Sequence, residues 1–255
     1  MSMGDAPRRP WLRWLLMSVF VVALAVTFVN LGRWQLDRLD QRRERNDTVA
    51  QHEAAPVQPF DKVFTHEITE ADQWQKVQVR GTFDAGRQLL VRYRSNAGDT
   101  GWEVVTPLRL ESGDAVLVDR GFVRRRGDED FPAVLPEPPA GAVTVVGHVR
   151  RNEQGPQNAV VPAQGAVRLI NSEAIAEGLP YRLANGYIGL LTVEPAQSGG
   201  FVAVQPPDLT EGPHLSYALQ WFSFAVIAGV GMVILIRGDL EAKRKAARRA
   251  DRDDG

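Results

Sequence analysis

Two dense apolar blocks near the ends of the chain constrain its fold most. They cover roughly residues 14–29 and 215–236, and about 180 residues of mixed composition lie between them, the size of one domain. The second block, of about 22 residues, is long enough to cross a hydrocarbon core of about 30 Å as a helix. The first block is shorter, and Trp11, Leu12 and Leu31 extend it. We therefore predict two transmembrane helices flanking one domain.

The basic residues predict the orientation of the second block. No Lys or Arg lies between Arg182 and Arg237, whereas six follow Arg237 within the last 18 residues of the chain. Because cytoplasmic flanks carry an excess of positive charge, the C-terminus is expected in the cytoplasm. Arginines also follow the first block, from Arg33 to Arg45, and alone they favour the opposite orientation. We follow the second block, because basic residues flank it on one side alone. The sequence therefore predicts a multi-pass protein of the cell membrane, with both termini cytoplasmic and the central domain extracytoplasmic.

The first block has a second interpretation as a cleaved signal peptide. Arg8, Arg9 and Arg13 form a basic n-region, and Ala23-Leu24-Ala25 resembles a cleavage site. The apolar run continues to Val29, which favours a retained anchor. The expected organisation is then a cytoplasmic N-terminus (1–10), a first transmembrane helix (11–31), an extracytoplasmic domain (32–213), a second transmembrane helix (214–236) and a basic cytoplasmic tail (237–255).

The central domain carries the two-residue period of β-strands. Short alternating runs are separated by turn signals such as residues 95–99, 112–114 and the Pro-rich stretch 131–141. One short helix is expected at 172–177, with Ser172 as its cap. Short strands with hairpin spacing predict a mainly-β domain, either an antiparallel sheet or a small barrel. The strands are expected near residues 77–82, 88–92, 102–110, 115–123, 143–150, 167–170 and 187–193.

Composition excludes several functions. The net charge is −1, so charge gives no reason to expect a nucleic-acid partner. The chain has no cysteine, which rules out disulfides and thiolate metal sites. With only four methionines as well, it lacks the soft ligands that deliver cuprous copper.

No catalytic constellation is visible in the sequence. A Gly-rich phosphate loop, a histidine pair at metal spacing and a Gly-x-Ser-x-Gly elbow are all missing. His52, His66 and His148 are scattered, and we interpret them as surface or hydrogen-bonded histidines. These patterns predict a binding or structural protein, and not an enzyme.

Polar and aromatic residues gather where each apolar block meets the central domain. If the two spans form an antiparallel hairpin, these groups meet at one membrane face. They can serve as interfacial anchors, or they can bind a ligand, because unpaired polar groups at that depth are costly. Small residues at Gly229 and Gly231 are expected to allow close helix approach. The two groups are Asn30, Gly32, Trp34 and Gln35, and His214, Tyr217, Gln220 and Trp221.

Four sequence blocks resemble the Surfeit locus protein 1 family of cytochrome c oxidase assembly factors. They occur in order between and beside two spans of the expected polarity, over about residues 10–237. The blocks are LGRWQLDRL at 31–39, VRGTF at 79–83, GWEVVTPL at 101–108 followed by VLVDRGFV at 116–123, and HLSYALQWF at 214–222.

The resemblance implies a membrane-bound respiratory-chain assembly factor that binds haem a transiently. Its partners would be the catalytic subunit of cytochrome c oxidase, other assembly factors and the lipid membrane. His214 would be the axial ligand of the haem iron, and Gln35 belongs to the matching block of the first span. We further expect Trp34 or Trp221 to pack a porphyrin edge and Arg38 or Arg33 to pair with propionates. The expected haem site therefore comprises His214, Tyr217, Trp221, Trp34, Gln35 and Arg38.

Two alternatives remain at this point. The protein could be a structural chaperone that stabilises an oxidase assembly intermediate by protein contacts and binds no cofactor. Contacts among His214, Gln35 and Trp34 would then serve helix packing. The protein could also be an anchored binding or sensor domain unrelated to respiration.

Overall fold

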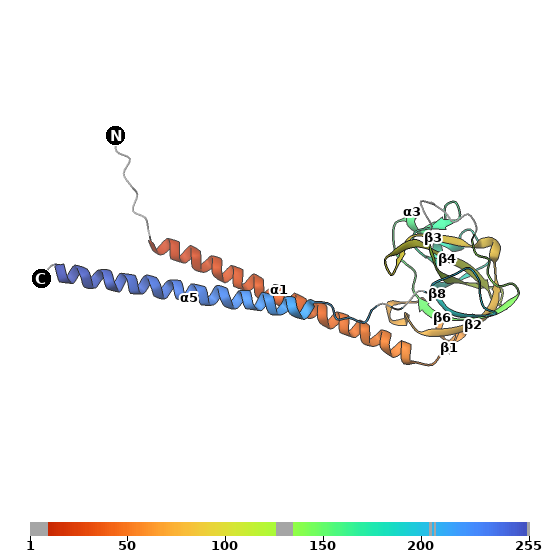
Figure 1. The fold of residues 1–255 in the computed structure, drawn as a ribbon, viewed down its shortest axis with the longest axis horizontal. Helices are drawn as coiled ribbons and strands as arrows, with labels where there is room; N and C mark the ends of the chain where they lie inside the picture. The colour runs from red at the N-terminus through yellow and green to blue at the C-terminus, as the bar shows by residue number, and fades with distance from the viewer. Residues whose placement is uncertain (1–9, 126–134, 204–205, 207, 254–255) are drawn as a thin grey trace, which may run out of the picture. The chain divides into compact units, whose positions relative to one another are not determined.

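The computed structural model describes residues 10–125, 135–203, 206 and 208–253 (Figure 1). The chain divides into two compact units. Residues up to Asn46 and from Thr210 onward form one unit, here called the helical hairpin. Asp47–Leu209 form the second, here called the β unit. Residues 32–46, which the sequence pattern groups with the central domain, thus belong to the hairpin.

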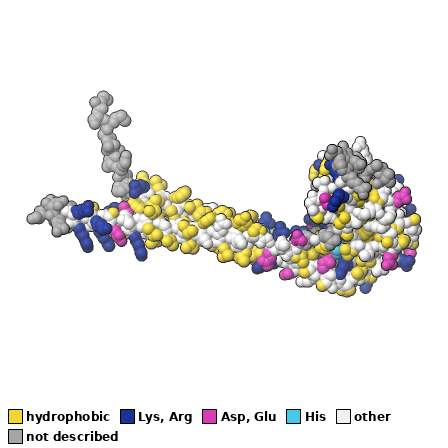
Figure 2. Space-filling model, in the orientation of Figure 1, with side chains coloured by type: hydrophobic (Ala, Val, Ile, Leu, Met, Phe, Trp, Pro, Cys, Tyr) yellow, Lys and Arg dark blue, Asp and Glu magenta, His cyan; other side chains and the backbone are white. Residues whose placement is uncertain are grey.

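The helical hairpin consists of α5 (His214–Asp253) and of α1 (Pro10–Ala54) as far as Asn46, and the last turns of α1 belong to the β unit. Both helices contain a stretch long and apolar enough to cross a membrane. Apolar side chains cover much of the visible hairpin surface, and basic side chains gather toward the C-terminal end of α5 (Figure 2). Because large apolar side chains such as Phe20 and Ile227 are about two-thirds exposed, this surface is suited to lipid and not to water. The expected pair of long apolar helices is confirmed.

The two helices pack antiparallel along a regular seam. Phe28, Gly32, Gln35 and Leu39 follow one another at intervals of four, three and four residues on α1, the spacing of a coiled-coil face. A Cβ atom on Gly32 would lie 2.5 Å from the ring of Phe222, so only glycine allows this approach. The expectation that Gly229 and Gly231 provide the close approach is wrong, because a Cβ on either would meet open space.

In the part of the β unit that the structure describes, eight strands form one sheet. Three short helices and two 3-10 turns occur in the same described residues. The strands are β1 (Gln58–Pro59), β2 (Lys76–Phe83), β3 (Leu89–Asn96), β4 (Asp99–Arg109), β5 (Ala115–Arg124), β6 (Ala142–Arg150), β7 (Ala166–Val167) and β8 (Leu183–Glu194). The helices are α2 (Phe60–Val63), α3 (Gln157–Val160) and α4 (Ser172–Ala176), and the 3-10 turns are Glu70–Asp72 and Ala85–Arg87.

Five of these strands close into a barrel. The order runs β2-β6-β8-β5-β4, and β4 returns to β2 through the pairs Thr82 with Arg109 and Phe83 with Leu108. The small barrel expected from the sequence is confirmed. The sheet is mixed, because β8 runs parallel to β5. Between β5 and β8 the chain forms β6, α3, β7 and α4, a connection long enough for these two strands to run parallel.

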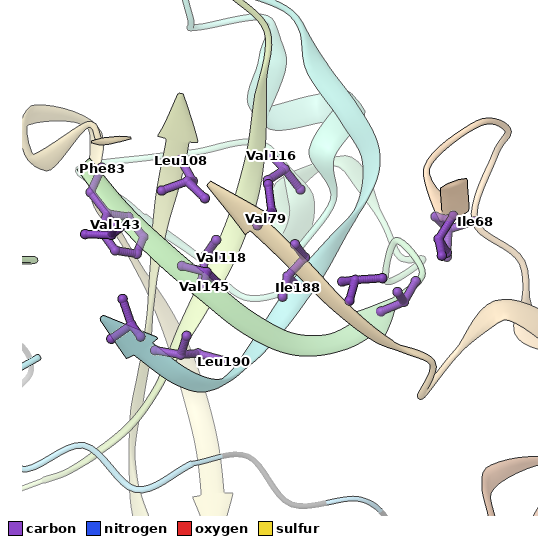
Figure 3. Packing of buried hydrophobic residues seen from close by; sticks show 14 residues of the cluster. Ile68, Val79, Phe83, Leu108, Val116, Val118, Val143, Val145, Ile188 and Leu190 are labelled. Carbon is purple, nitrogen blue, oxygen red and sulfur yellow. The ribbon is translucent and has the colours of Figure 1, made fainter. Parts of the chain in front are cut away.

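Alternate side chains of the barrel strands form its core. Val79, Phe83, Leu108, Val116 and Val118 are among the buried residues that meet there (Figure 3). Because successive residues of a strand face opposite sides, Leu117 and Asp119 of β5 lie on the outer face instead. A second apolar cluster that includes Leu117, α4 and β7 covers part of that face.

Local signals placed most turns correctly. The β3–β4 hairpin turns at Ala97 and Gly98, both at positive φ, as a tight two-residue loop requires.

The expected Ser172 cap is wrong: the side chain of Asn171 accepts from the Ala174 N–H at 3.1 Å. The strand expected at 167–170 is only the two residues of β7. Residues 131–134 of the Pro-rich stretch lie outside the described residues.

Candidate functional site

The hairpin brings the two polar groups together at one pair of residues. Nδ1 of His214 lies 2.8 Å from Oε1 of Gln35. Gln35 is buried in the seam between Gly32 and Leu39, and His214 is the first residue of α5. The amide oxygen can only accept a hydrogen bond, so Nδ1 of the imidazole donates. In the neutral ring, Nε2 then keeps its lone pair for another partner.

The chain before α5 sets the position of this histidine. Gly212 adopts a φ of 69°, and Pro213 precedes the first helical residue. The carbonyl of Pro213 accepts from the Tyr217 N–H at 3.1 Å, which starts the helical bonding. His214 therefore lies on the first turn of a helix, and not on an irregular loop.

Aromatic side chains lie deeper in the hairpin than His214. The ring of Trp221 stacks on Phe28 with centroids 5.8 Å apart and meets Phe224 edge-on at 5.9 Å. Tyr217, one turn after His214, leaves 47% of its surface exposed. Trp221 is thus held by its neighbours, whereas Tyr217 presents a free surface.

Trp34 and Arg38 form a separate pair on α1. The guanidinium carbon of Arg38 lies 5.8 Å from the centroid of the Trp34 ring, and its Nη1 donates to Gln41 at 3.1 Å. Trp34 is half exposed. Among the described residues, no hydrogen bond joins Trp34 or Arg38 to His214, so neither shares the His214–Gln35 bond.

An exposed ion pair extends the hairpin beyond His214. Nε and Nη2 of Arg43 donate to the two carboxylate oxygens of Glu211 at 2.8 and 3.0 Å. This bidentate bond lowers the pKa of Glu211. It aligns the residues before α5 with the α1 segment that leaves the apolar stretch.

The other three histidines all have partners, as expected. His52 contacts the Gln73 carbonyl at 2.7 Å, and His66 contacts Asp72 at 3.2 Å. His148 is 2% exposed and contacts the carboxylate of Glu53. Among residues 10–125, 135–203, 206 and 208–253, no three His, Asp or Glu side chains are grouped so that they could hold a metal ion.

The outer face of the barrel holds a second candidate site, here called the β-unit cavity. Its volume is about 140 Å³, and charged side chains from β3, β4, β5 and β6 line it. Arg94 pairs with Glu103 and with Glu153, each at 2.7 Å. Asp119, His148 and Arg150 complete the polar lining.

Burial changes the pKa values of residues that line this cavity. It raises the pKa of Asp119 well above the ordinary value of 3.8, and the neighbouring Glu103 adds to the shift. It also raises the pKa of Glu103, against the opposing effect of Arg94. Burial lowers the pKa of His148 despite the nearby Glu53 carboxylate. At neutral pH, His148 is therefore a neutral imidazole.

Comparisons with known proteins decide the family. The sequence model of the SURF1 family matches residues 22–226, which include part of each apolar helix and the whole β unit. The chain belongs to the SURF1 family. SURF1-like proteins of Mycobacterium tuberculosis and Mycobacterium bovis, both uncharacterised, are 30% identical over 238 residues, covering 91% of this chain and 86% of theirs.

Two eukaryotic relatives extend the comparison. A SURF1-like protein of Monosiga brevicollis is 30% identical over 247 residues, covering 89% of this chain and 88% of its own. The cytochrome oxidase assembly protein SHY1 of Saccharomyces cerevisiae is 30% identical over 105 residues, which are 40% of this chain and 26% of SHY1.

The β-unit cavity of this SURF1 protein was not predicted from its sequence. Glu103 and Asp119 were visible only as parts of the matching blocks. A signal was nevertheless present, because each is a charged residue inside an otherwise apolar strand. Buried charges are rare unless they are paired, so such positions predict a polar cluster. Their partners Arg94 and Arg150 come from other strands, which periodicity does not reveal.

Proposed function

We propose that this protein is a membrane-bound assembly factor for cytochrome c oxidase that binds haem a transiently at the helical hairpin. Membership of the SURF1 family and the similarity to SHY1 support the oxidase role. The catalytic subunit of the oxidase is the proposed recipient. The protein would carry its cargo without transforming it.

The His214–Gln35 hydrogen bond carries the haem proposal. It holds the imidazole in the tautomer whose Nε2 can donate to iron. Haem iron in proteins commonly takes a histidine nitrogen as an axial ligand. The imidazole of His214 and its hydrogen bond to Gln35 therefore fit a haem group. When bound, haem a supplies a redox-active iron porphyrin, and His214 holds it.

Side chains around His214 suit the rest of the cargo. Tyr217 and Trp221 follow on the same side of α5 and offer aromatic surface. Trp34 and Arg38 lie on α1, where an exposed indole could cover a ring edge and a guanidinium could pair with a propionate. One imidazole ligand without a second is suited to release, because a tight two-histidine site would retain the haem.

The haem content of the purified full chain tests this proposal. The protein is produced in cells that make haem a and purified in detergent, and its reduced-minus-oxidised spectrum is recorded. Wild type is expected to carry haem, and His214→Ala is expected to lose it. His66→Ala is the matched control, since that histidine is exposed in the β unit and pairs only with neighbouring polar side chains. Equal haem in wild type and His214→Ala would refute the ligand role.

A structural chaperone is the second candidate, because the same hydrogen bond also packs the helices. Gln35 is buried and its partner lies on the other helix. In that case the chain would recover the oxidase catalytic subunit equally from haem-containing and haem-free cells. Recovery that requires haem a would instead support the cargo role.

We also propose that the β unit is extracytoplasmic and the basic end of α5 cytoplasmic. The run of Lys and Arg after Arg237 supports this orientation. The chain has no cysteine, so the labelling of a single introduced cysteine reports on which side of the membrane that position lies. A membrane-impermeant maleimide added to spheroplasts is expected to label Ser112→Cys and to spare Lys243→Cys. The reverse pattern would overturn the orientation.

A further inference from the structure

The β-unit cavity lies where three neighbouring strands present polar residues side by side. Gly189 of β8 pairs with Asp119 of β5 on one side and His148 of β6 on the other. Two residues earlier, Tyr187 pairs with Arg150. Because residues two apart on a strand face the same side, these side chains open into one space. At Gly189 there is no side chain, and a Cβ there would touch nothing closer than 3.8 Å.

One wall of the cavity holds a cluster of one arginine and two glutamates. Arg94 bridges the carboxylates of Glu103 and Glu153. Glu153 also accepts from the Ile170 N–H at 2.7 Å. Nη2 of Arg94 donates to both carboxylate oxygens of Glu153, so these groups are paired with one another, although Nε of Arg94 makes no hydrogen bond.

The opposite wall consists of hydrogen-bond donors that lack acceptors. Nε of Arg150 is buried and has no hydrogen-bond partner among the residues that the structure describes. The guanidinium stacks 4.0 Å from the centroid of the Trp74 ring, and no described carboxylate pairs with it within 4.0 Å. Tyr187 is 3% exposed and lines the cavity, yet its hydroxyl makes no hydrogen bond to a described residue.

From these observations we propose that the β-unit cavity binds a small carboxylate, with its oxygens on the Arg150 guanidinium and the Tyr187 hydroxyl. Buried donors without acceptors are costly, and a carboxylate of matching shape would accept hydrogen bonds from them. The planar fork of arginine pairs best with a planar carboxylate. Burial raises the pKa of the neighbouring Asp119, which favours its neutral form beside an anion.

Size and charge favour a carboxylate over other ligands. The volume of about 140 Å³ admits a group of a few heavy atoms and excludes a porphyrin. A phosphate dianion would meet stronger repulsion from Glu103 and Glu153 than a monoanion. A metal cation would face Arg94 and Arg150, and no group of at least three potential ligands is present among the described residues.

Ligand-observed NMR with ¹³C-labelled acetate tests the site on the full chain in detergent. Wild type is expected to broaden the acetate signal, and excess formate is expected to compete. Acetamide, which has the same shape without the charge, is expected not to compete. Inorganic phosphate and Ca²⁺ are included as separate competitors. Competition by either one stronger than that of formate would contradict the carboxylate assignment.

Two variants test the site in different ways. Arg150→Met keeps an apolar stem over Trp74 and removes the charge. It is expected to weaken acetate binding at least about tenfold, the value of one charge-assisted hydrogen-bonded pair. Gly189→Val fills the cavity and keeps every charge, with the same expected loss. Arg124→Met is the control, because that arginine is 70% exposed and pairs with Asp99 on the surface.

The outcomes separate cleanly. Loss in both site variants and retention in the control support the proposal. Binding that survives either Arg150→Met or Gly189→Val, or its absence from wild type, overturns it. Should Gly189→Val fail to fold by circular dichroism, Gly189→Ala makes a smaller incursion and is expected to weaken binding partially. Haem content, which depends on His214, is measured in parallel, so failure of this site is distinguishable from failure of the hairpin site.

Discussion

Nδ1 of His214 donates to Oε1 of Gln35 over 2.8 Å, joining residues 179 positions apart in the chain. One helix thereby sets the proton position of a histidine on the other. This arrangement resembles the partners that orient metal-bound histidines, whose second nitrogen is usually hydrogen-bonded. Gln35 is therefore a positioning residue for the proposed ligand.

Substitutions of Gln35 should change haem occupancy in opposite directions. Gln35→Leu removes the acceptor and frees the imidazole to adopt either tautomer, so haem content should fall, by roughly tenfold for loss of such a partner. Gln35→Glu offers a negative acceptor and should strengthen donation from Nε2, giving higher occupancy and slower transfer. The measurements are the haem spectrum of the purified protein and the rate of haem loss to apomyoglobin. Identical spectra for all three proteins would show that Gln35 only packs.

Gly32→Leu should separate the two helices. The added side chain would collide with the Phe222 ring, and such overpacking costs about 1–3 kcal/mol. Spin labels on cysteines introduced at Val22 and Val230 should then report a longer and broader distance distribution by pulsed electron paramagnetic resonance. Gly229→Leu is the matched control, because its Cβ meets open space. A distribution equal to that of wild type in Gly32→Leu would argue against the close seam.

Arg120 should be a strong contributor to the stability of the β unit. It is 1% exposed and donates to Gln197, Gln88 and the carbonyls of Pro136 and Glu137. Burial lowers its pKa to about 10, which leaves the guanidinium charged at neutral pH. Arg120→Met leaves several buried acceptors without a hydrogen-bond donor. It should lower the free energy of unfolding by about 3 kcal/mol or more.

Urea unfolding followed by near-ultraviolet circular dichroism measures the effect of Arg120→Met. Arg87→Met serves for comparison, since that exposed side chain donates only to the Gly178 carbonyl at 3.3 Å. A loss no larger than that of Arg87→Met would mean that the buried contacts add little.

Asp119→Asn should become more stable relative to wild type as the pH rises. In wild type, the folded carboxyl keeps its proton at pH values where the unfolded one has lost it, because burial raises its pKa. The folded state then binds more protons, so the unfolding free energy falls as the pH rises above about 4, by at most about 1.4 kcal/mol per pH unit. Asparagine does not titrate and can still accept from the Gly121 N–H.

The pH experiment compares the two proteins at several pH values between 4.5 and 8, a range set by that same raised pKa. Taking the difference removes His148, whose lowered pKa acts in the opposite direction in both proteins. Glu103, Arg94 and Arg150 also face Asp119 and remain in both. Parallel stability curves would show that Asp119 is ionised in the folded protein.

Local patterns predicted what depends on neighbours in sequence. The apolar blocks gave α1 and α5, and alternation gave β2 to β6 and β8 nearly to their ends. The parallel pairing of β5 with β8 and the closure of β4 on β2 are contacts between distant segments, which periodicity does not encode. The polar end of α1 continues as helix to Ala54, where the carboxylate of Glu53 contacts His148 of β6.

The two candidate sites also differ in how far the sequence predicted them. That Gln35 and His214 would meet followed from an antiparallel hairpin and is confirmed by their hydrogen bond. Trp34 lies one residue before Gln35, about 100° around the helix, and its ring contacts Arg38. The β-unit cavity needed three strands in register before its charges could be seen together.

The closed barrel limits how a partner can recognise the β unit. Ring closure leaves only β1 and β7 as outer strands in the described sheet, and each has two residues. They cover little of their neighbours, since β7 pairs only with Leu90 and Val91 of β3, whose outer edge continues to Asn96. A chain that joined the β unit as an added strand would therefore do so at such a partly covered edge, and not around the closed ring.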